Sequence, residues 1–224
     1  MQRGTVADLK TVVIKDNDLS YAVEVFLRGG LVAVPTETVY GLAGNGLDAS
    51  AVMKIYSVKG RPPVKPLSLL VPGLDVAETL CAFIPESMRV LAEAFWPGPL
   101  TIVLPRSAAV PDIVTAGGDT IGVRCPDHPK TLEFLRLAGV PAAAPSANIS
   151  DMPSPKSAQD VLAYFDSKID CIIDGGVCAL GIESTIVDLT TEPFRILRHG
   201  ALPEEEIAMA LDRGLKGAKA RNGG

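Results

Sequence analysis

Short apolar runs alternate with amphipathic stretches along this chain, a pattern typical of an α/β protein. Leu31-Val-Ala-Val-Pro35 is a continuous apolar run bounded by Gly and Pro, so it predicts a strand buried on both faces. Other strands are expected at residues 11–14, 66–71, 100–104, 121–125, 140–144, 170–173, 184–189 and 194–197. Helices are expected near residues 19–27, 51–60, 76–83, 87–95, 131–137, 157–164 and 204–211.

The strands in this pattern outnumber the helices that could cross over between them. Some strands must therefore pair antiparallel, and we expect a mixed sheet. Neither an internal repeat nor a break in composition divides the chain, so residues 1–212 are expected to form one α/β domain. Residues 213–224 are basic and rich in Gly, with little apolar content, and are expected to form a mobile basic tail.

Composition narrows the class of protein. Hydrophobic residues make up 47% of the 224 residues and charged residues 21%, which excludes a largely disordered chain. The net charge of -5 excludes a uniformly basic surface, so any site for an anion must be local. Four cysteines without CxxC spacing predict reduced, buried thiols. The first ten residues lack an apolar run of signal-peptide length, and we expect a cytoplasmic protein.

A basic loop is the strongest local signal for chemistry. Every charged side chain between Ala49 and Leu74 is basic, and Lys59, Arg61 and Lys65 flank a stretch stiffened by proline. A planar Arg fork and a Lys point charge can converge on one phosphate group. A solvated surface loop explains this segment alone equally well.

Three further segments offer small polar groups next to predicted strands. Residues 142–148 are a run of small residues that contains Ser146 and Asn148. These two side chains could face a ligand, but taken alone they are better explained by local turn chemistry. Thr120 and Arg124 could anchor a carboxylate or a phosphate along one strand, and Ser184 adds a hydroxyl. For these three residues, as for Arg198, a turn or a surface ion pair is at least as good an explanation.

Several common chemistries have no matching motif. The chain contains no GxxxxGK[ST], GxGxxG, HExxH or GxSxG sequence, and its two histidines, His128 and His199, lie in turn-like contexts that favour structural roles. Lys, Arg, Ser, Thr and Asn position and neutralise anions but are poor proton shuttles at neutral pH. Such a set suits phosphoryl or nucleotidyl transfer.

Seven segments in order resemble the signature of the YrdC family, the L-threonylcarbamoyl-AMP synthases. They are Pro35-Thr-Glu-Thr-Val-Tyr-Gly-Leu42, Lys59-Gly-Arg-Pro62 with Lys65-Pro-Leu67, Phe95-Trp-Pro-Gly-Pro-Leu-Thr101, Gly122-Val-Arg-Cys-Pro126, Pro145-Ser-Ala-Asn148, Gly181-Ile-Glu-Ser-Thr185 and Ile196-Leu-Arg198. The resemblance runs from about Gly30 to Gly200. It implies a twisted, open mixed sheet flanked by helices, with a large concave basic cavity.

The resemblance also implies an activity. Family members join L-threonine, bicarbonate and ATP into threonylcarbamoyl-AMP and release pyrophosphate. A separate transferase complex then moves the threonylcarbamoyl group to an adenosine of certain tRNAs. ATP is therefore the expected co-substrate, and Mg²⁺ is expected with it. The mobile basic tail leaves contact with tRNA or double-stranded RNA open.

Residue roles follow from the same resemblance. Lys59 and Arg61 match the family's charge-neutralising pair and are the expected catalytic residues. The positions that match contacts to L-threonine are Thr38, Arg124, Ala144 and Ser184. Those that match contacts to ATP are Lys59, Arg61, Lys65, Thr120, Ser146, Asn148, Ser154 and Arg198. No residue is assigned as a metal ligand or as a general base.

The sequence departs from the family pattern in two places. Leu70 stands where many members carry a His near the threonine pocket. Longer members append a second domain that closes over the nucleotide, so closure is expected to come from elsewhere here, for example from the tail. Two alternative functions stay open: a non-catalytic module that binds structured RNA, and a domain that uses carbamoyl phosphate.

Overall fold

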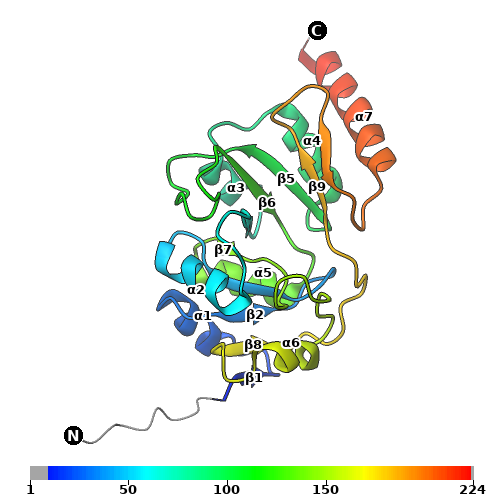
Figure 1. Ribbon diagram of the computed structural model, residues 1–224. Coiled ribbons are helices and arrows are strands. Elements are labelled where there is room, and N and C mark those ends of the chain that lie inside the picture. The colour runs from blue at the N-terminus through cyan, green and yellow to red at the C-terminus, as the bar shows by residue number, and fades with distance from the viewer. Residues whose placement is uncertain (1–9, 223–224) are drawn as a thin grey trace, which may run out of the picture.

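A computed structural model describes residues 10–222 and places ten strands in one mixed sheet (Figure 1). The strand order is β1-β8-β2-β3-β7-β4-β6-β5-β9-β10. The strands are β1 (Val12–Ile14), β2 (Val32–Val34), β3 (Gly41–Asn45), β4 (Ser68–Leu70), β5 (Leu100–Pro105), β6 (Thr120–Arg124), β7 (Ala142–Ala143), β8 (Cys171–Ile173), β9 (Thr185–Asp188) and β10 (Arg195–Arg198). Parallel pairs such as β4 with β6 alternate with antiparallel pairs such as β5 with β6, which confirms the mixed sheet.

Seven helices accompany the sheet within the described residues. They are α1 (Ser20–Leu27), α2 (Ala49–Lys59), α3 (Leu74–Leu80), α4 (Glu86–Phe95), α5 (Pro129–Ala138), α6 (Ala158–Phe165) and α7 (Glu204–Asn222). Alternate residues of β2 belong to two different cores: Ala33 packs in the larger one, and Val32 and Val34 pack in the smaller one. The strand is therefore buried on both faces, as its apolar run predicts.

The two cores draw mostly on different helices, and α5 contributes to both, with Leu132 in the larger core. Helices α1 and α5 supply the smaller core together with β1, β2 and β8, and the rings of Phe26 and Phe134 meet edge to face with centroids 5.0 Å apart. The larger core contains residues of α2, α3, α4, α6 and α7. Figure 1 shows α1 near the N-terminal end of the molecule and α4 beside α7 at the other end.

Local sequence signals explain where α2 begins and ends. The Asp48 carboxylate accepts a hydrogen bond from the Ser50 backbone N–H at 2.8 Å, as expected of a residue that caps a helix. Gly60 takes the left-handed conformation (φ +59°) and ends the helix directly after Lys59. Lys59 and Arg61 therefore lie on either side of a helix end.

One strand of the sheet departs from the expectation. Strand β3, which contains Gly41 and Gly44, was not predicted, because these residues lack the β-branched side chains that indicate a strand. A Cβ atom at Gly44 would lie 3.1 Å from Ile55 and 3.2 Å from Leu31, so the glycine lets α2 and β2 pack closely here.

The segment expected to form a mobile basic tail begins inside a helix. Helix α7 continues without a break past Asp212 to Asn222, and residues 223–224 lie outside the described part. Gly214 lies close against α4, since a Cβ there would clash with Val90 at 2.4 Å. The expected boundary at residue 212 therefore falls inside α7. Mobility of the segment stays a prediction.

Two other expectations can be compared with the described residues. The four cysteines are buried and form no disulfide, and burial raises the pKa of the Cys171 thiol to about 12. Helices long and apolar enough to cross a membrane are absent from residues 10–222. The expectation about the first ten residues falls largely on residues 1–9, which lie outside the described part.

Candidate active site

A cavity of about 400 Å³ opens where the ends of α2, β4, β6, β7, β9 and β10 meet. All but one of the site residues predicted from the sequence line it: Thr38, Lys59, Arg61, Lys65, Arg124, Ala144, Ser146, Asn148, Ser154, Ser184 and Arg198. The exception is Thr120, which lies at the exposed start of β6. Leu70 is also part of the lining.

Lys59 enters the cavity from the last position of α2 and is 1% exposed. Its ammonium group donates hydrogen bonds to the backbone carbonyls of Ser146 and Asn148. The basic loop and the Ser-Ala-Asn turn are thus in direct contact. Burial, and then the nearby charge of Arg61, lowers the pKa of Lys59 to about 8.

Arg61 holds the rest of the basic loop in place. Its Nε and Nη2 atoms donate to the backbone carbonyls of Lys65 (3.3 Å) and Pro66 (3.0 Å). Lys65 lies 3.7 Å from the carboxylate of Asp151, and both side chains are exposed. We call Lys59, Arg61 and Lys65 the basic-loop cluster. Among the residues that the structure describes, neither Lys59 nor Arg61 forms an ion pair with a carboxylate.

The Ser-Ala-Asn turn is held by its own side chains. Ser146 Oγ donates to Asn148 Oδ1 at 2.5 Å, and Asn148 Nδ2 donates to the carbonyl of Met152 at 2.6 Å. Local turn chemistry therefore does account for the hydrogen bonds that Ser146 and Asn148 form within the turn. The same turn presents two carbonyls to Lys59, which ties it to the cavity.

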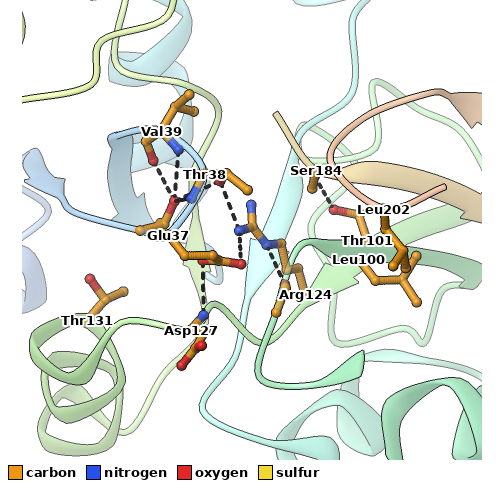
Figure 2. A network of polar contacts seen from close by, with 12 residues as sticks. Glu37, Thr38, Val39, Leu100, Thr101, Arg124, Asp127, Thr131, Ser184 and Leu202 are labelled. Atoms are coloured by element: carbon orange, nitrogen blue, oxygen red, sulfur yellow. Dashed lines mark hydrogen bonds and ion pairs between the residues drawn. The ribbon is translucent and has the colours of Figure 1, made fainter. Parts of the chain in front are cut away.

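Arg124 is held on three sides by groups of the protein. Nε donates to the Gly98 carbonyl at 3.1 Å, and Nη2 donates to Glu37 Oε1 at 2.7 Å and to Thr38 Oγ1 at 2.9 Å (Figure 2). The backbone N–H of Asp127 donates to the other oxygen of Glu37 at 3.0 Å. Among the described residues, Nη1 of Arg124 has no hydrogen-bond partner. We call Glu37, Thr38 and Arg124 the paired cluster.

The hydroxyl of Thr36 fixes the direction of hydrogen bonds in this cluster. Thr36 Oγ1 lies 2.6 Å from the carbonyl oxygen of Val39, which can only accept, so the Thr36 proton lies between them. The 2.8 Å contact between the hydroxyls of Thr36 and Thr38 must then use the proton of Thr38. Thr38 Oγ1 is therefore the acceptor that Arg124 requires.

A second guanidinium organises the side of the cavity around Ser184. Arg198 Nη2 donates to Ser184 O (2.8 Å) and Oγ (3.0 Å), and Nη1 donates to Glu183 at 2.5 Å. Glu183 also accepts from Ser154 Oγ at 2.8 Å. The hydroxyl of Thr101 lies 2.8 Å from that of Ser184 (Figure 2).

Three of these polar residues were given no role from the sequence: Glu37, Thr101 and Glu183. All three lie in segments that carried the family resemblance, and Glu183 directly precedes Ser184. A chemical signal existed for Glu37, since an acidic residue between two threonines at the end of a buried strand needs a partner. The pattern could not show that the partner is Arg124, 87 positions away.

The charge of the lining explains how an acidic protein can hold an anion. Five cationic side chains face the cavity, namely Lys59, Arg61, Lys65, Arg124 and Arg198, against the carboxylates Asp151 and Glu183. The excess of positive charge is local, as the net charge of -5 requires.

Comparison with known proteins matches a family model to this chain. Residues 24–200 match the model Sua5_yciO_yrdC, described as telomere recombination. The chain belongs to this family. The family resemblance drawn from the seven segments is thereby confirmed, and the match covers the basic-loop cluster, the paired cluster and Arg198.

Relatives and a solved structure place the chain within this family. It is 52% identical to threonylcarbamoyl-AMP synthase of Pyrococcus abyssi over 81% of this chain and 54% of that protein. It is 40% identical to the Bacillus subtilis protein of the same name, over 89% of this chain and 60% of the relative. The crystal structure of P. abyssi Sua5 complexed with L-threonine superposes with a TM-score of 0.87 at 46% identity, over 89% of this chain and 60% of that one.

Two consequences follow for the family assignment. The expected open mixed α/β sheet is confirmed by the structural match. The chain spans little more than half the length of these relatives, so their whole activity is not carried over with the family.

Proposed function

We propose that this protein is an L-threonylcarbamoyl-AMP synthase, which joins L-threonine, bicarbonate and ATP and releases pyrophosphate. One observation carries the proposal: a single cavity brings Lys59 and Arg61, which form no ion pair within residues 10–222, together with an oriented guanidinium, Arg124. The first pair suits a polyphosphate, and the second group suits a carboxylate. The names of the relatives from P. abyssi and B. subtilis support it.

The amino-acid substrate would bind at the paired cluster. Nη1 of Arg124 carries two N–H groups that are free to bind a carboxylate. Ala144 and Ser184 complete the pocket, together with Thr38. That the P. abyssi Sua5 structure contains L-threonine supports an amino-acid pocket in this fold. Leu70 at 3% exposure gives this pocket an apolar wall where many family members carry a His.

The nucleotide would bind along the basic-loop cluster. Lys59 and Arg61 would offset the negative charge that develops on the phosphates and on the departing pyrophosphate, which is their proposed catalytic role. The remaining proposed contacts to ATP are Lys65, Thr120, Ser146, Asn148, Ser154 and Arg198. Thr120 is exposed on β6, so it would contact a part of ATP that extends beyond the cavity.

Catalysis would depend on alignment. Threonine's neutral amine would combine with bicarbonate, by way of carbon dioxide, to form a carbamate and water. A carbamate oxygen would then attack the α-phosphorus while the bond to pyrophosphate breaks. Mg²⁺ would arrive on the phosphates of ATP, since the two carboxylates of the lining, Asp151 and Glu183, are already paired with Lys65 and Arg198. The product would be passed to a transferase complex that modifies tRNA.

Product formation tests the proposal. The purified protein is incubated with ATP, bicarbonate and labelled threonine, leaving out one component at a time. Pyrophosphate and a labelled AMP adduct should form only when all three are present. Pyrophosphate release without threonine would contradict the proposal. Turnover of carbamoyl phosphate without threonine would favour that alternative, and RNA binding without an adduct would favour the binding module.

A further inference from the structure

The two groups of cations in the cavity differ in how their charge is compensated. Glu37 Oε1 lies 2.7 Å from Nη2 of Arg124, and the two side chains are 10% and 8% exposed. The basic-loop cluster has only the exposed contact of Lys65 with Asp151 at 3.7 Å. Arg124 and Glu37 together are neutral, whereas Lys59 and Arg61 add two charges to the lining.

Glu37 is fixed where it stands. Oε1 accepts from Arg124, and Oε2 accepts from the backbone N–H of Asp127. Both oxygens are therefore engaged, and the carboxylate cannot turn away when an anion approaches Arg124. Any group that binds the free Nη1 edge of Arg124 must do so close to a fixed negative charge.

We propose that Glu37, which contacts Arg124 from outside the lining, determines specificity at this cation: it admits a singly charged carboxylate to Arg124 and rejects polyphosphate from the amino-acid pocket. The inference rests on the proposed function, in which both ligands occupy one cavity. A carboxylate gains two hydrogen bonds from Nη1 and meets the negative charge of Glu37 with a single charge of its own. A polyphosphate would bring several charges against it, and that repulsion selects by disfavouring the wrong ligand.

The charge of Glu37 would prevent phosphates from competing with the amino acid for Arg124 in the shared cavity. ATP and pyrophosphate carry more charge than threonine, and an uncompensated Arg124 would attract them more strongly. Pyrophosphate or ATP bound at Arg124 would block the amino acid. By pairing with Arg124, Glu37 leaves the basic-loop cluster as the favoured place for phosphates.

Competition between threonine and pyrophosphate tests the inference without turnover. Binding of labelled threonine is measured at equilibrium while pyrophosphate is titrated in the absence of ATP. In the unmodified protein, pyrophosphate should leave threonine affinity unchanged. In Glu37→Gln, which keeps the shape of the side chain but removes its charge, saturating pyrophosphate should weaken threonine binding about tenfold or more.

Two variants separate charge from position. Glu78→Gln is the matched control, because Glu78 makes a 2.7 Å ion pair with Arg89 on an exposed surface, and neither residue lines the cavity. It should behave as the unmodified protein does. Glu37→Asp keeps the negative charge, and should still exclude pyrophosphate even if threonine binds more weakly.

The outcomes are distinct. Competition by pyrophosphate in the unmodified protein, or equal competition in Glu37→Asp and Glu37→Gln, would overturn the inference. Loss of threonine binding in Glu37→Gln without any effect of pyrophosphate would also overturn it, since Glu37 would then only orient Arg124. If the unmodified protein binds no threonine at all, the proposed function fails instead. Competition in the unmodified protein would overturn the inference even if Glu37→Gln does not fold.

Discussion

Arg124 and Lys59 are both buried cations in one cavity, yet the protein holds them in opposite ways. Arg124 donates to a carboxylate, a hydroxyl and a carbonyl, whereas Lys59 donates to two backbone carbonyls. The carbonyls stabilise the ammonium group but leave its charge uncompensated, and burial shifts the Lys59 pKa down to about 8. A buried charge that is already paired makes the loss of its partner costly, whereas a buried charge without a counter-charge is disfavoured until an anion binds.

Replacement of Arg124 by Met should have the largest effect on stability. Glu37 would be left buried without its partner, and breaking such a pair costs about 3 to 5 kcal/mol of the free energy of unfolding. Arg61→Met should cost about 1 kcal/mol or less, because Arg61 donates only to exposed loop carbonyls. Urea denaturation measures both values.

A double variant checks the cause of that loss. Glu37→Gln combined with Arg124→Met removes both charges, so it should recover a large part of the stability that Arg124→Met loses. An equal loss in the single and double variants would mean that packing of the Arg side chain, and not the unpaired carboxylate, carries the effect.

Lys59→Met and Arg61→Met should each lower kcat/KM for ATP about ten- to a hundredfold. Each removes one charge-assisted contact to the phosphates, worth about 1.5 to 3 kcal/mol. Release of pyrophosphate measures the effect. Lys168→Met is a suitable control, since Lys168 also donates to a backbone carbonyl, that of Tyr164, but lies exposed outside the cavity. Unchanged kinetics in both cavity variants would refute their assigned roles.

The lowered pKa of Lys59 predicts a pH dependence of ATP binding. Lys59 loses its proton in the free protein as pH rises through about 8, whereas bound phosphate would retain it. The affinity for ATP should therefore fall above pH 8, by up to about tenfold per pH unit. Calorimetry between pH 6.5 and 9.5 measures the trend, and in Lys59→Arg it should be absent.

Stability should respond to the same group with the opposite sign. The Lys59 pKa is about 8 in the folded protein and 10.5 for the unperturbed side chain, so the unfolded chain binds more protons between these values. The contribution of Lys59 to the free energy of unfolding should therefore rise with pH across this window. Lys59→Arg removes the titration and should remove that rise, which a comparison of the two proteins by denaturation detects.

Asp151→Asn should have the smallest effect. Asp151 pairs with Lys65 at 3.7 Å where both side chains are exposed, so the pair is weak. Removing its charge should strengthen ATP binding by less than about fivefold and leave threonine binding unchanged. Asn tolerates the left-handed backbone of residue 151 (φ +66°), so the loop should keep its shape. A large change in threonine affinity would show that the two clusters are not independent.

Sequence patterns were sufficient for most of the fold because the signals are local. The apolar run before Thr36 predicted β2, and the helix expected near residues 51–60 is α2, which lies between the caps Asp48 and Gly60. Strand β3 was not predicted, because Gly44 serves the close packing of α2 against the strand. That contact is tertiary, and no local sequence pattern shows it. Helix α7 extends further than expected, and Gly214 lies close against Val90 of α4.

The candidate site was predictable to a different degree. Residues that match segments of the family signature, such as Lys59 and Ser146, do come together around one cavity. The partnership of Glu37 with Arg124 could not be predicted, because it joins the ends of two strands that are not neighbours in the sheet. Thr120 lies outside the cavity because its strand carries it to the exposed end of β6. The roles of these residues toward substrates stay predictions.

The left-handed residue Gly60 has a consequence for how the basic pair could be transplanted. On a continuous helix, side chains two positions apart project about 200° from one another, which is nearly back to back. Gly60 ends the helix with its left-handed conformation, so the helical angle does not apply to Lys59 and Arg61, and both side chains line the same cavity. If Lys-Gly-Arg were grafted into the middle of a helix, the sequence would be kept, but the two cationic side chains would no longer face the same ligand.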